Sequence, residues 1–195
     1  ADVRSLIIGC GYVGEALGQR LIALGHGVTG IRRADEQNDR LAKLGIHPLN
    51  LDITEAEALD RLDESFDHVV VAVSSSRGGR EAHKRVFGAG IGNVCAWLKT
   101  HTARSVVFIS STSVYRQTEG EWVDEKSRTA MDNATSKTLR DAEDQFASVD
   151  SPITILRSSG IYGPGRGYLF QQFIKGAATI DGTGERFLNL SLIHI

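Results

Sequence analysis

The chain has 195 residues, of which 41% are hydrophobic and 24% are charged, and its formal net charge is -2. These proportions are ordinary for a globular protein, and they exclude an intrinsically disordered chain. The near-neutral charge argues against a nucleic-acid-binding surface as the main feature of the molecule. With about 150 residues in a typical domain, the length predicts one full domain and part of another.

The cysteine content and the hydropathy indicate in which cellular compartment the protein is expected. Cys10 and Cys95 are the two cysteines, too few for a disulfide framework or a zinc cage, which fits a reducing environment. No apolar run approaches the roughly 18 residues that cross a bilayer, and the N-terminal residues show no signal-peptide pattern. We therefore expect a cytoplasmic protein that binds neither membrane nor nucleic acid and has no metal site.

Short apolar runs alternate with longer amphipathic stretches along the whole chain. The expected strands are residues 5–8, 27–31, 47–51, 68–73, 105–109 and 152–156. The expected helices are residues 14–24, 36–44, 54–62, 81–99 and 130–147, with Thr54 as an N-cap. Because strand and helix alternate, the predicted fold class is α/β, a doubly wound parallel sheet with helices on both faces.

A glycine-rich turn joins the first expected strand to the first expected helix. It reads Gly-Cys-Gly-Tyr-Val-Gly, the GxGxxG pattern of a dinucleotide-binding turn in a Rossmann sheet. The first glycine permits the tight turn, the second lets the backbone approach a pyrophosphate, and the third allows close packing of helix on strand. The helix N-terminus then offers N–H groups to the phosphates. The pattern predicts that a nucleotide contacts Gly9, Gly11, Tyr12, Val13 and Gly14.

Two arginines follow the second expected strand, where an NAD-binding protein usually has an acidic residue. Arg32 and Arg33 stand there, and the first acid after this strand is Asp35. A guanidinium fork suits a phosphate, so NADP is the predicted cofactor and NAD the alternative, unless both arginines lie on a solvated loop. Asp52 is a candidate acceptor for the adenine amino group or, alternatively, an acid at a helix start. The predicted cofactor contacts also include Ile53, Val73 and Ser74.

Three further motifs follow the glycine turn in a characteristic order. Residues 110–115 read Ser-Ser-Thr-Ser-Val-Tyr, residues 136–137 read Ser-Lys, and Leu156-Arg157 precedes Ile-Tyr-Gly-Pro at 161–164. Together with the glycine turn, this arrangement resembles the extended and atypical short-chain dehydrogenase/reductase superfamily, the NAD(P)-dependent epimerase/dehydratase group. The resemblance covers nearly the whole chain.

The resemblance implies roles for individual residues. Ser111, four residues before Tyr115, takes the position of the hydroxyl that hydrogen-bonds the substrate's reacting oxygen. Lys137 takes the position of the lysine that binds the ribose, and Tyr162 lies in the loop near the nicotinamide. The implied substrate is a sugar nucleotide or a similar carbonyl or hydroxyl compound. In an alternative interpretation, the hydroxyls of residues 110–113 cap the backbone at a strand end.

One departure from the family pattern affects the catalytic pair Tyr-x-x-x-Lys. Asn133 stands four residues before Lys137, and none of the 4 tyrosines has a lysine four residues later. An amide donates a hydrogen bond but cannot exchange a proton near neutral pH. The proton donor would therefore be a substitute: Tyr115, a water near Lys137, or a group of the C-terminal lobe. Thr112 and Ser113 replace the Asp-Glu pair of sugar-nucleotide 4,6-dehydratases, which argues against dehydratase chemistry.

These observations predict an NADP-dependent reductase or epimerase of the short-chain type, with a homodimer left open. The alternative is an NAD(P)-binding sensor or structural protein without turnover. Residues 1–165 are expected to form the NAD(P)-binding domain, and residues 166–195 the start of a small, incomplete C-terminal substrate lobe. Because residues 187–195 are largely apolar, we expect this tail to be disordered or paired with another chain.

Overall fold

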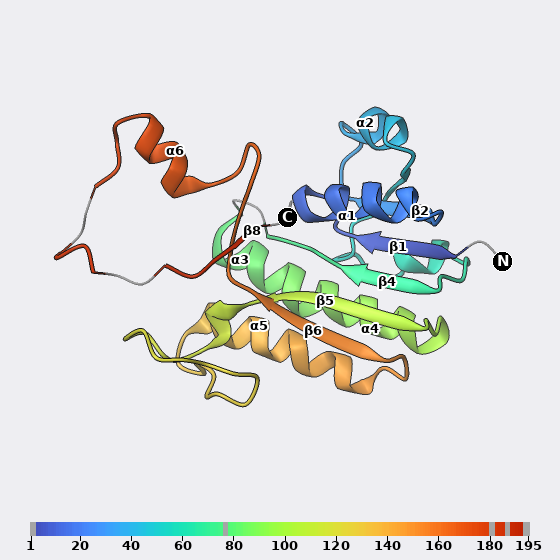
Figure 1. The fold of residues 1–195 in the computed structure, drawn as a ribbon. Coiled ribbons are helices and arrows are strands. Elements are labelled where there is room, and N and C mark those ends of the chain that lie inside the picture. The colour runs from blue at the N-terminus through green and yellow to red at the C-terminus, as the bar shows by residue number, and fades with distance from the viewer. Residues whose placement is uncertain (1–2, 76–77, 180–181, 186–187, 193–195) are drawn as a thin grey trace.

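Six strands form one parallel sheet in the order β3-β2-β1-β4-β5-β6 (Figure 1). The structure, a computed structural model, describes residues 3–75, 78–179, 182–185 and 188–192. The strands are β1 (Arg4–Ile8), β2 (Gly27–Arg32), β3 (His47–Asn50), β4 (His68–Val71), β5 (Ser105–Ser111) and β6 (Ile153–Ser158). Every pairing in this sheet is parallel. This confirms the predicted α/β class and the doubly wound strand order.

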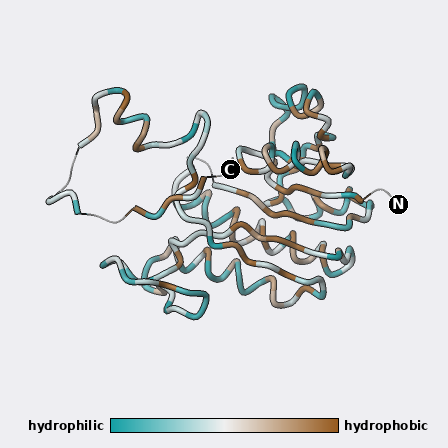
Figure 2. The backbone as a smooth tube through the Cα atoms, viewed as in Figure 1, coloured by the Kyte–Doolittle hydropathy of each residue, from teal (hydrophilic) through white to brown (hydrophobic). Residues whose placement is uncertain are grey.

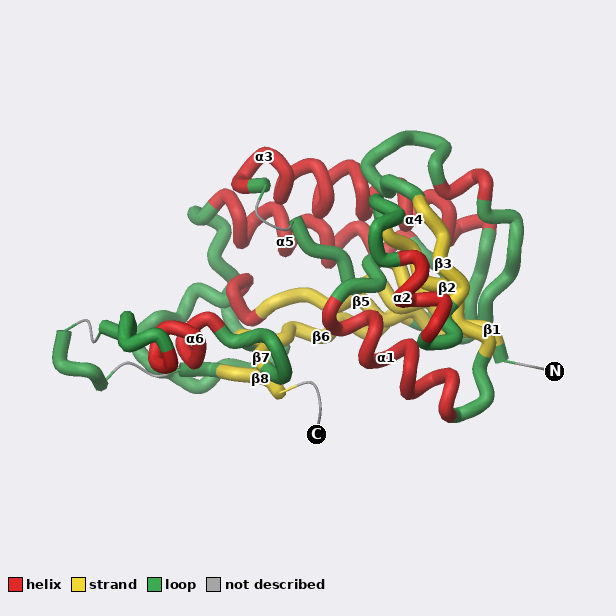
Figure 3. Tube along the Cα trace, turned by 90° about the horizontal axis from the view of Figure 1, so that it is seen from above, coloured by secondary structure: helices red, strands yellow, loops and turns green. Residues whose placement is uncertain are grey.

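Helices cover both faces of the sheet (Figure 3). The helices are α1 (Tyr12–Ala23), α2 (Asn38–Lys43), α3 (Gly79–Lys84), α4 (Ile91–Thr100), α5 (Ala134–Gln145) and α6 (Tyr168–Ile174). In Figure 3, α1 and α2 lie on one side of the sheet and α3, α4 and α5 on the other. This arrangement agrees with the expected helices on both faces.

The core forms two clusters because alternate residues of a strand point to opposite faces of the sheet. Figure 2 shows that hydrophobic residues concentrate along the strands. On the α1 and α2 side, Ile7 packs with Val28 and Leu41. On the other side, Ile8 belongs to a larger cluster with Phe108. The sheet therefore holds the carboxyl ends of its central strands at fixed positions relative to α1 and α5.

The prediction of a helix at residues 54–62 is wrong. Only one 3₁₀ turn, Leu59–Arg61, forms there. The carboxylate of Asp52 accepts hydrogen bonds from the N–H and the hydroxyl of Thr54, at 2.9 and 2.7 Å. Thr54 is thus a donor to a turn and not the N-cap of a helix. Glu57 then has a φ of 65°, a left-handed conformation that interrupts a right-handed helix.

Other expected boundaries are shifted. The helix expected at 81–99 has a π-helical stretch, Arg85–Gly90, between α3 and α4. A Cβ atom at Gly90 would lie 3.0 Å from the side chain of Ile53, so this stretch packs closely on the chain that follows β3. The helix expected from residue 130 begins at Ala134, and the one expected from residue 36 begins at Asn38.

The C-terminal part of the chain lies beside the sheet and not within it (Figure 1). Strands β7 (Gly160–Tyr162) and β8 (Leu190–Leu192) pair in a parallel two-stranded sheet. Residues 190–192 therefore pair within the chain. The prediction that the tail is disordered or paired with another chain is wrong for these residues. Residues 187 and 193–195 lie outside the described residues. Among the described residues, no helix combines the length and apolar character needed to cross a bilayer.

Candidate cofactor and active site

The glycine turn has the geometry that its sequence pattern requires. Gly9 has a φ of +88°, and a Cβ atom there would lie 2.6 Å from the carbonyl oxygen of Ala72 at the end of β4. A Cβ atom at Gly14 would lie 2.9 Å from the side chain of Ile7, so α1 packs tightly on β1. At Gly11 a Cβ atom would meet nothing within 4 Å. The turn is thus closed on its two packed sides and open at its middle glycine.

A cavity of about 310 Å³ opens at this turn. It lies where the strand order reverses between β1 and β4, the usual position for ligands in a doubly wound sheet. The predicted cofactor residues that line it are Gly9, Gly11, Tyr12, Val13, Arg32, Arg33, Asp52, Ile53, Val73 and Ser74. Gly14, Lys137 and Tyr162 were also predicted to contact the cofactor, but they do not line the cavity. Residues far apart in the sequence therefore meet at one cavity with an apolar and a cationic side.

The cavity fits a dinucleotide in two respects. No side-chain cap is described at the N-terminus of α1, where a helix leaves its first N–H groups without intrahelical partners. The open surface at Gly11 lets a phosphate approach these groups. The glycine turn, the helix start and the cavity therefore suit a pyrophosphate between two nucleosides.

Sequence reasoning missed several residues of the cavity wall. Arg166 lines the cavity, and its guanidinium carbon lies 5.1 Å from the centre of the Tyr12 ring. It comes from the loop that follows the Tyr-Gly-Pro motif, in a Gly-Pro-Gly-Arg-Gly run at 163–167 whose flanking glycines mark a tight turn. Cys10 and Ile161 also line the cavity. Burial raises the pKa of the Cys10 thiol to about 11, with a further increase from Glu15 and an opposing effect of Arg32.

The two predicted cofactor arginines have different environments. Arg32 donates to the carbonyl oxygen of Cys10 at 3.1 Å and pairs with Glu15 at 3.5 Å. Glu15 is held in turn by Arg40 at 2.9 Å. Arg33 is exposed and makes no hydrogen bond or ion pair within the described part of the chain. Arg32 thus fixes the glycine turn, whereas the guanidinium of Arg33 remains available.

Asp52 is held as a carboxylate at the cavity wall. Burial alone would raise its pKa, but two hydrogen bonds from Thr54 and the nearby charges of Arg33 and Arg85 outweigh burial and lower the pKa. Both hydrogen bonds from Thr54 go to the Oδ1 atom of Asp52, so the Oδ2 atom of Asp52 is available to a ligand. The alternative interpretation of Asp52 as an acid at a helix start is wrong, since the element that follows it is the short 3₁₀ turn Leu59–Arg61 and not an α-helix.

The two serines at the end of β5 face different partners. Ser110 is buried, and its hydroxyl donates to Glu143 of α5 at 2.6 Å. Arg157 of β6 holds the same carboxylate with Nε at 3.0 Å and Nη2 at 2.7 Å. The hydroxyl oxygen of Ser111 accepts from the N–H of Ser113 at 3.1 Å and so caps a 3₁₀ turn. A hydroxyl that accepts one bond retains its proton for donation, so Ser111 can still bind an oxygen of a ligand.

The first turn of α5 carries the other candidate residues. Asn133 is the N-cap: its side-chain oxygen accepts from the N–H groups of Thr135 at 2.9 Å and Ser136 at 3.1 Å. The ammonium group of Lys137 pairs with Asp141 at 2.6 Å. The hydroxyl of Ser136 donates to the carbonyl oxygen of Ser113 at 2.7 Å. This last bond brings the helix start beside the segment that contains Ser111.

The catalytic candidates do not line the cofactor cavity. The ring of Tyr115 packs against the core, with the Arg157 guanidinium carbon 4.9 Å from its centre. Neither Ser111 nor Lys137 belongs to the cavity wall, although Ile109, two residues before Ser111, does. In the described part of the chain, no group of three or more His, Cys, Asp or Glu side chains is arranged to hold a metal ion.

Comparison with known proteins gives the family. The sequence profile of the NAD dependent epimerase/dehydratase family matches residues 5–180. The chain belongs to this family. The resemblance stated from the motifs is therefore confirmed, and membership of an NAD-dependent family implies a nicotinamide dinucleotide as the cofactor. Protein YeeZ of Escherichia coli K12 is 26% identical over 97% of this chain and 68% of its own length.

Solved structures of the epimerase/dehydratase family share the fold. A proposed NAD-dependent epimerase/dehydratase from Methylobacillus flagellatus is 29% identical, with a TM-score of 0.77 over 100% of this chain and 67% of that one. The UDP-glucuronic acid 4-epimerase of Bacillus cereus, solved with UDP-glucuronic acid and NAD, is 20% identical, with a TM-score of 0.78 over 98% of this chain and 69% of that one. The chain thus spans about two thirds of the length of these relatives.

Proposed function

We propose that this chain forms the cofactor-binding part of an NADP-dependent oxidoreductase or epimerase that acts on a sugar nucleotide or a similar carbonyl or hydroxyl compound. The observation that carries the proposal is the cavity between β1 and β4, whose wall includes both the open glycine turn and Arg33. When bound, the nicotinamide dinucleotide supplies hydride transfer. The cytoplasmic location expected from the sequence remains a prediction, and the homodimer is left open.

The difference between Arg32 and Arg33 supports NADP over NAD. Arg32 is already engaged with the Cys10 carbonyl and Glu15, so it orients the glycine turn. Arg33 is the arginine with an available guanidinium, and a guanidinium binds a phosphate through two parallel hydrogen bonds. Arg33 is therefore the residue proposed to bind the 2′-phosphate of NADP. Asp52 beside it is proposed to accept from the adenine amino group.

Ser111 is the residue proposed to hold the reacting oxygen of the substrate. Its position at the carboxyl end of β5, two residues after Ile109 of the cavity wall, supports this role. Its hydroxyl proton can be donated, because the bond from Ser113 uses only a lone pair of the oxygen. The proton for the reaction has to come from a group other than Asn133, whose amide cannot exchange one near neutral pH.

A second candidate function, dinucleotide binding without turnover, is favoured by two contacts of α5. Asn133 uses its side-chain oxygen as a helix cap, and Lys137 is paired with Asp141. In the described part of the chain, neither side chain forms a hydrogen bond with Ser111 or Tyr115, the hydroxyl groups available to a proton relay. A protein of this type would report the redox state of the cofactor through its bound and free forms.

One experiment separates the two functions. Calorimetry first measures the affinity of the full protein for NADPH and NADH. Turnover over a panel of sugar nucleotides is then followed in two ways, with Ser111→Ala as the active-site control: absorbance measures net nicotinamide oxidation or reduction by a reductase, and chromatography of the products measures epimer formation, which regenerates the cofactor in each cycle. Turnover of one member that Ser111→Ala abolishes supports the enzyme. Tight NADPH binding without turnover of any member supports the second function, and failure to bind either dinucleotide contradicts both.

A further inference from the structure

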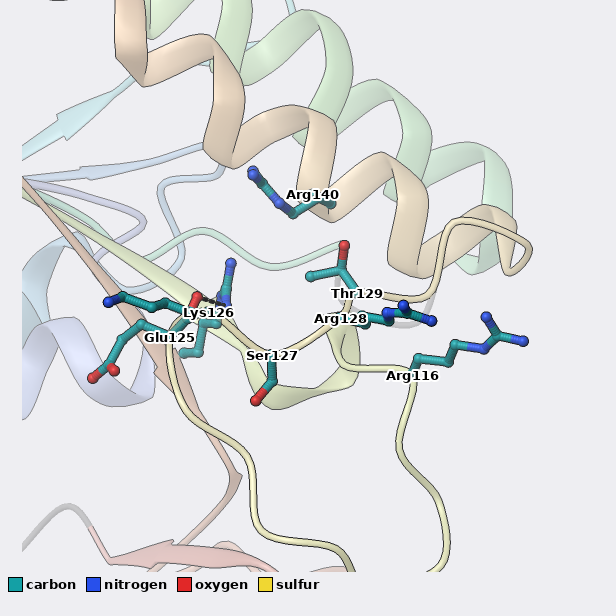
Figure 4. A pocket seen from close by; sticks show the side chains of 8 residues that line it. Arg116, Glu125, Lys126, Ser127, Arg128, Thr129 and Arg140 are labelled. Atoms are coloured by element: carbon teal, nitrogen blue, oxygen red, sulfur yellow. Dashed lines mark hydrogen bonds between the residues drawn. The ribbon is translucent and has the colours of Figure 1, made fainter.

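A second cavity, of about 410 Å³, lies between the loop that follows β5, the middle of α5 and the end of β6 (Figure 4). Its wall consists of Arg116, Glu125, Lys126, Ser127, Arg128, Thr129, Arg140 and Arg157. None of these residues lines the cofactor cavity. It opens near the carboxyl ends of β5 and β6, the edge of a parallel sheet at which ligands bind. We call it the basic pocket.

Positive charge dominates the wall of the basic pocket. Five of its residues are arginine or lysine, and Glu125 is its one acid. Arg140 and Arg157 are already neutralised, because Arg140 pairs with Asp144 and both arginines pair with Glu143. The side chains of Arg116, Lys126 and Arg128 form no ion pair with any described residue. Three cationic groups of the pocket thus lack a counter-charge from the described part of the chain.

Two of these cations oppose each other across a short antiparallel pairing. Tyr115 bridges Thr129, and the N–H of Arg116 donates to the carbonyl oxygen of Arg128 at 3.1 Å. Like charges at opposite positions of paired strands are destabilising. Figure 4 shows that the two guanidinium groups point to the same side of the pocket. An anion between them would remove this repulsion.

We propose that the basic pocket binds the phosphate group of a small ligand, at a site separate from the cofactor. Two guanidinium forks, those of Arg116 and Arg128, supply charge for a dianion, and arginine forks match the oxygens of a phosphate. The side chain of Lys126 extends to the other side of the pocket (Figure 4). The hydroxyl of Thr129 also lies at the wall; it donates to the sulfur of Met131 at 3.8 Å, a weak bond that a phosphate oxygen can replace. The polar, charged wall is unsuited to an apolar ligand.

The packing behind the pocket keeps it in shape. Arg157 donates to the carbonyl oxygen of Glu125 at 3.4 Å, and its guanidinium also lies against the ring of Tyr115. Through these contacts the buried Arg157–Glu143 pair holds the loop at Tyr115, where it begins, and at Glu125, between Arg116 and Arg128. The site therefore has a rigid base and exposed cationic side chains at its mouth.

The test is calorimetric titration of the full chain with inorganic pyrophosphate, in the presence of NADPH so that the cofactor cavity is filled. We expect Arg116→Gln and Arg128→Gln each to weaken pyrophosphate binding by about tenfold, the lower range for a charge-assisted hydrogen bond at an exposed position. Arg116→Lys keeps the charge but removes the fork, so its loss should be smaller. Arg61→Gln changes an exposed arginine that lines neither cavity, and it should leave binding unchanged.

Three results would overturn the proposal. The wild type gives no binding heat with pyrophosphate; the double variant Arg116→Gln/Arg128→Gln binds it as well as the wild type; or Arg61→Gln weakens binding as much as the pocket variants do. Circular dichroism of each variant confirms that the fold is retained. Because the variants change only the basic pocket, a loss of pyrophosphate binding confined to them identifies this pocket whether or not NADPH fills the cofactor cavity.

Discussion

The side-chain oxygen of Asn133 accepts a hydrogen bond from the N–H of Ser136 at 3.1 Å and thereby caps α5. This position is four residues before Lys137, where the family pattern has its catalytic tyrosine. A residue with a short side-chain acceptor satisfies the N–H groups of the first helical turn, which a tyrosine at the same place cannot do. The chain thus has a helix cap at the position where the family pattern has its catalytic tyrosine.

The cap predicts a measurable effect on stability. Replacing a capping asparagine with alanine removes the acceptor for two N–H groups, so Asn133→Ala should lower the free energy of unfolding by about 0.5–2 kcal/mol. Asn133→Asp keeps the acceptor and should stay close to the wild type. Urea unfolding followed by circular dichroism measures the difference. Equal stability of the alanine and wild-type proteins would mean that the cap is not formed in solution.

Substitutions at Asn133 also test its role in catalysis. A positioned general acid contributes about 10²–10⁴-fold to a rate. Asn133→Tyr should recover only a small part of this factor, because Lys137 is held by Asp141. Asn133→Phe, which lacks the hydroxyl, is the matched control in the turnover assay. A hundredfold gain with tyrosine and none with phenylalanine would show that only the hydroxyl had been missing.

Local backbone chemistry explains why the sheet and the glycine turn could be predicted from the sequence. The turn depends on a positive φ at Gly9 and on close packing at Gly14, which only a residue without Cβ satisfies. The absent helix at 54–62 could not be predicted, because its residues have helical periodicity and the interruption comes from the turn at Asp52. The partners of Arg32 also escaped prediction, since Cys10 and Glu15 are distant in the sequence and only the fold brings them near. The pair of Lys137 and Asp141 is an i,i+4 contact within α5, which helical spacing could have indicated.

Arg33 and Arg32 should affect cofactor binding in different ways. Arg33→Ala should reduce the preference for NADPH over NADH by about tenfold to a hundredfold, because one or two charge-assisted hydrogen bonds of about 1.5–3 kcal/mol each are lost, less at an exposed position. Arg32→Ala should weaken both dinucleotides alike, because Arg32 holds the carbonyl of Cys10 in the glycine turn. Calorimetry with each dinucleotide decides. Equal affinities of the wild type for NADPH and NADH would contradict the role of Arg33.

The buried pair of Glu143 and Arg157 should contribute strongly to stability. The Glu143 side chain is 3% exposed and Arg157 14%. Removing one partner of a buried pair leaves the other charge without compensation and costs about 3–5 kcal/mol. Glu143→Ala should therefore unfold at much lower urea concentration than the wild type. Glu143→Gln keeps an acceptor for Ser110 and should lie between them, and an alanine variant as stable as the wild type would refute the buried pair.

The two cysteines should react slowly in the native protein, and the cofactor should protect only one of them. Burial raises the pKa of Cys10 and of Cys95 from 9.0 to about 11. Since the thiolate is the reactive form, two pH units correspond to about a hundredfold less thiolate at neutral pH. Alkylation by iodoacetamide should accordingly rise steeply as the pH increases towards 11.

Cys10 lines the cofactor cavity and Cys95 does not, so the pair contains its own control. Saturation with NADPH should slow the alkylation of Cys10 further, because a bound dinucleotide covers the turn, and leave the rate at Cys95 unchanged. Mass spectrometry of the digested protein measures both sites in one sample. Equal protection of the two cysteines would indicate a general tightening of the fold, and fast modification of Cys10 at neutral pH would show that the glycine turn is open in solution.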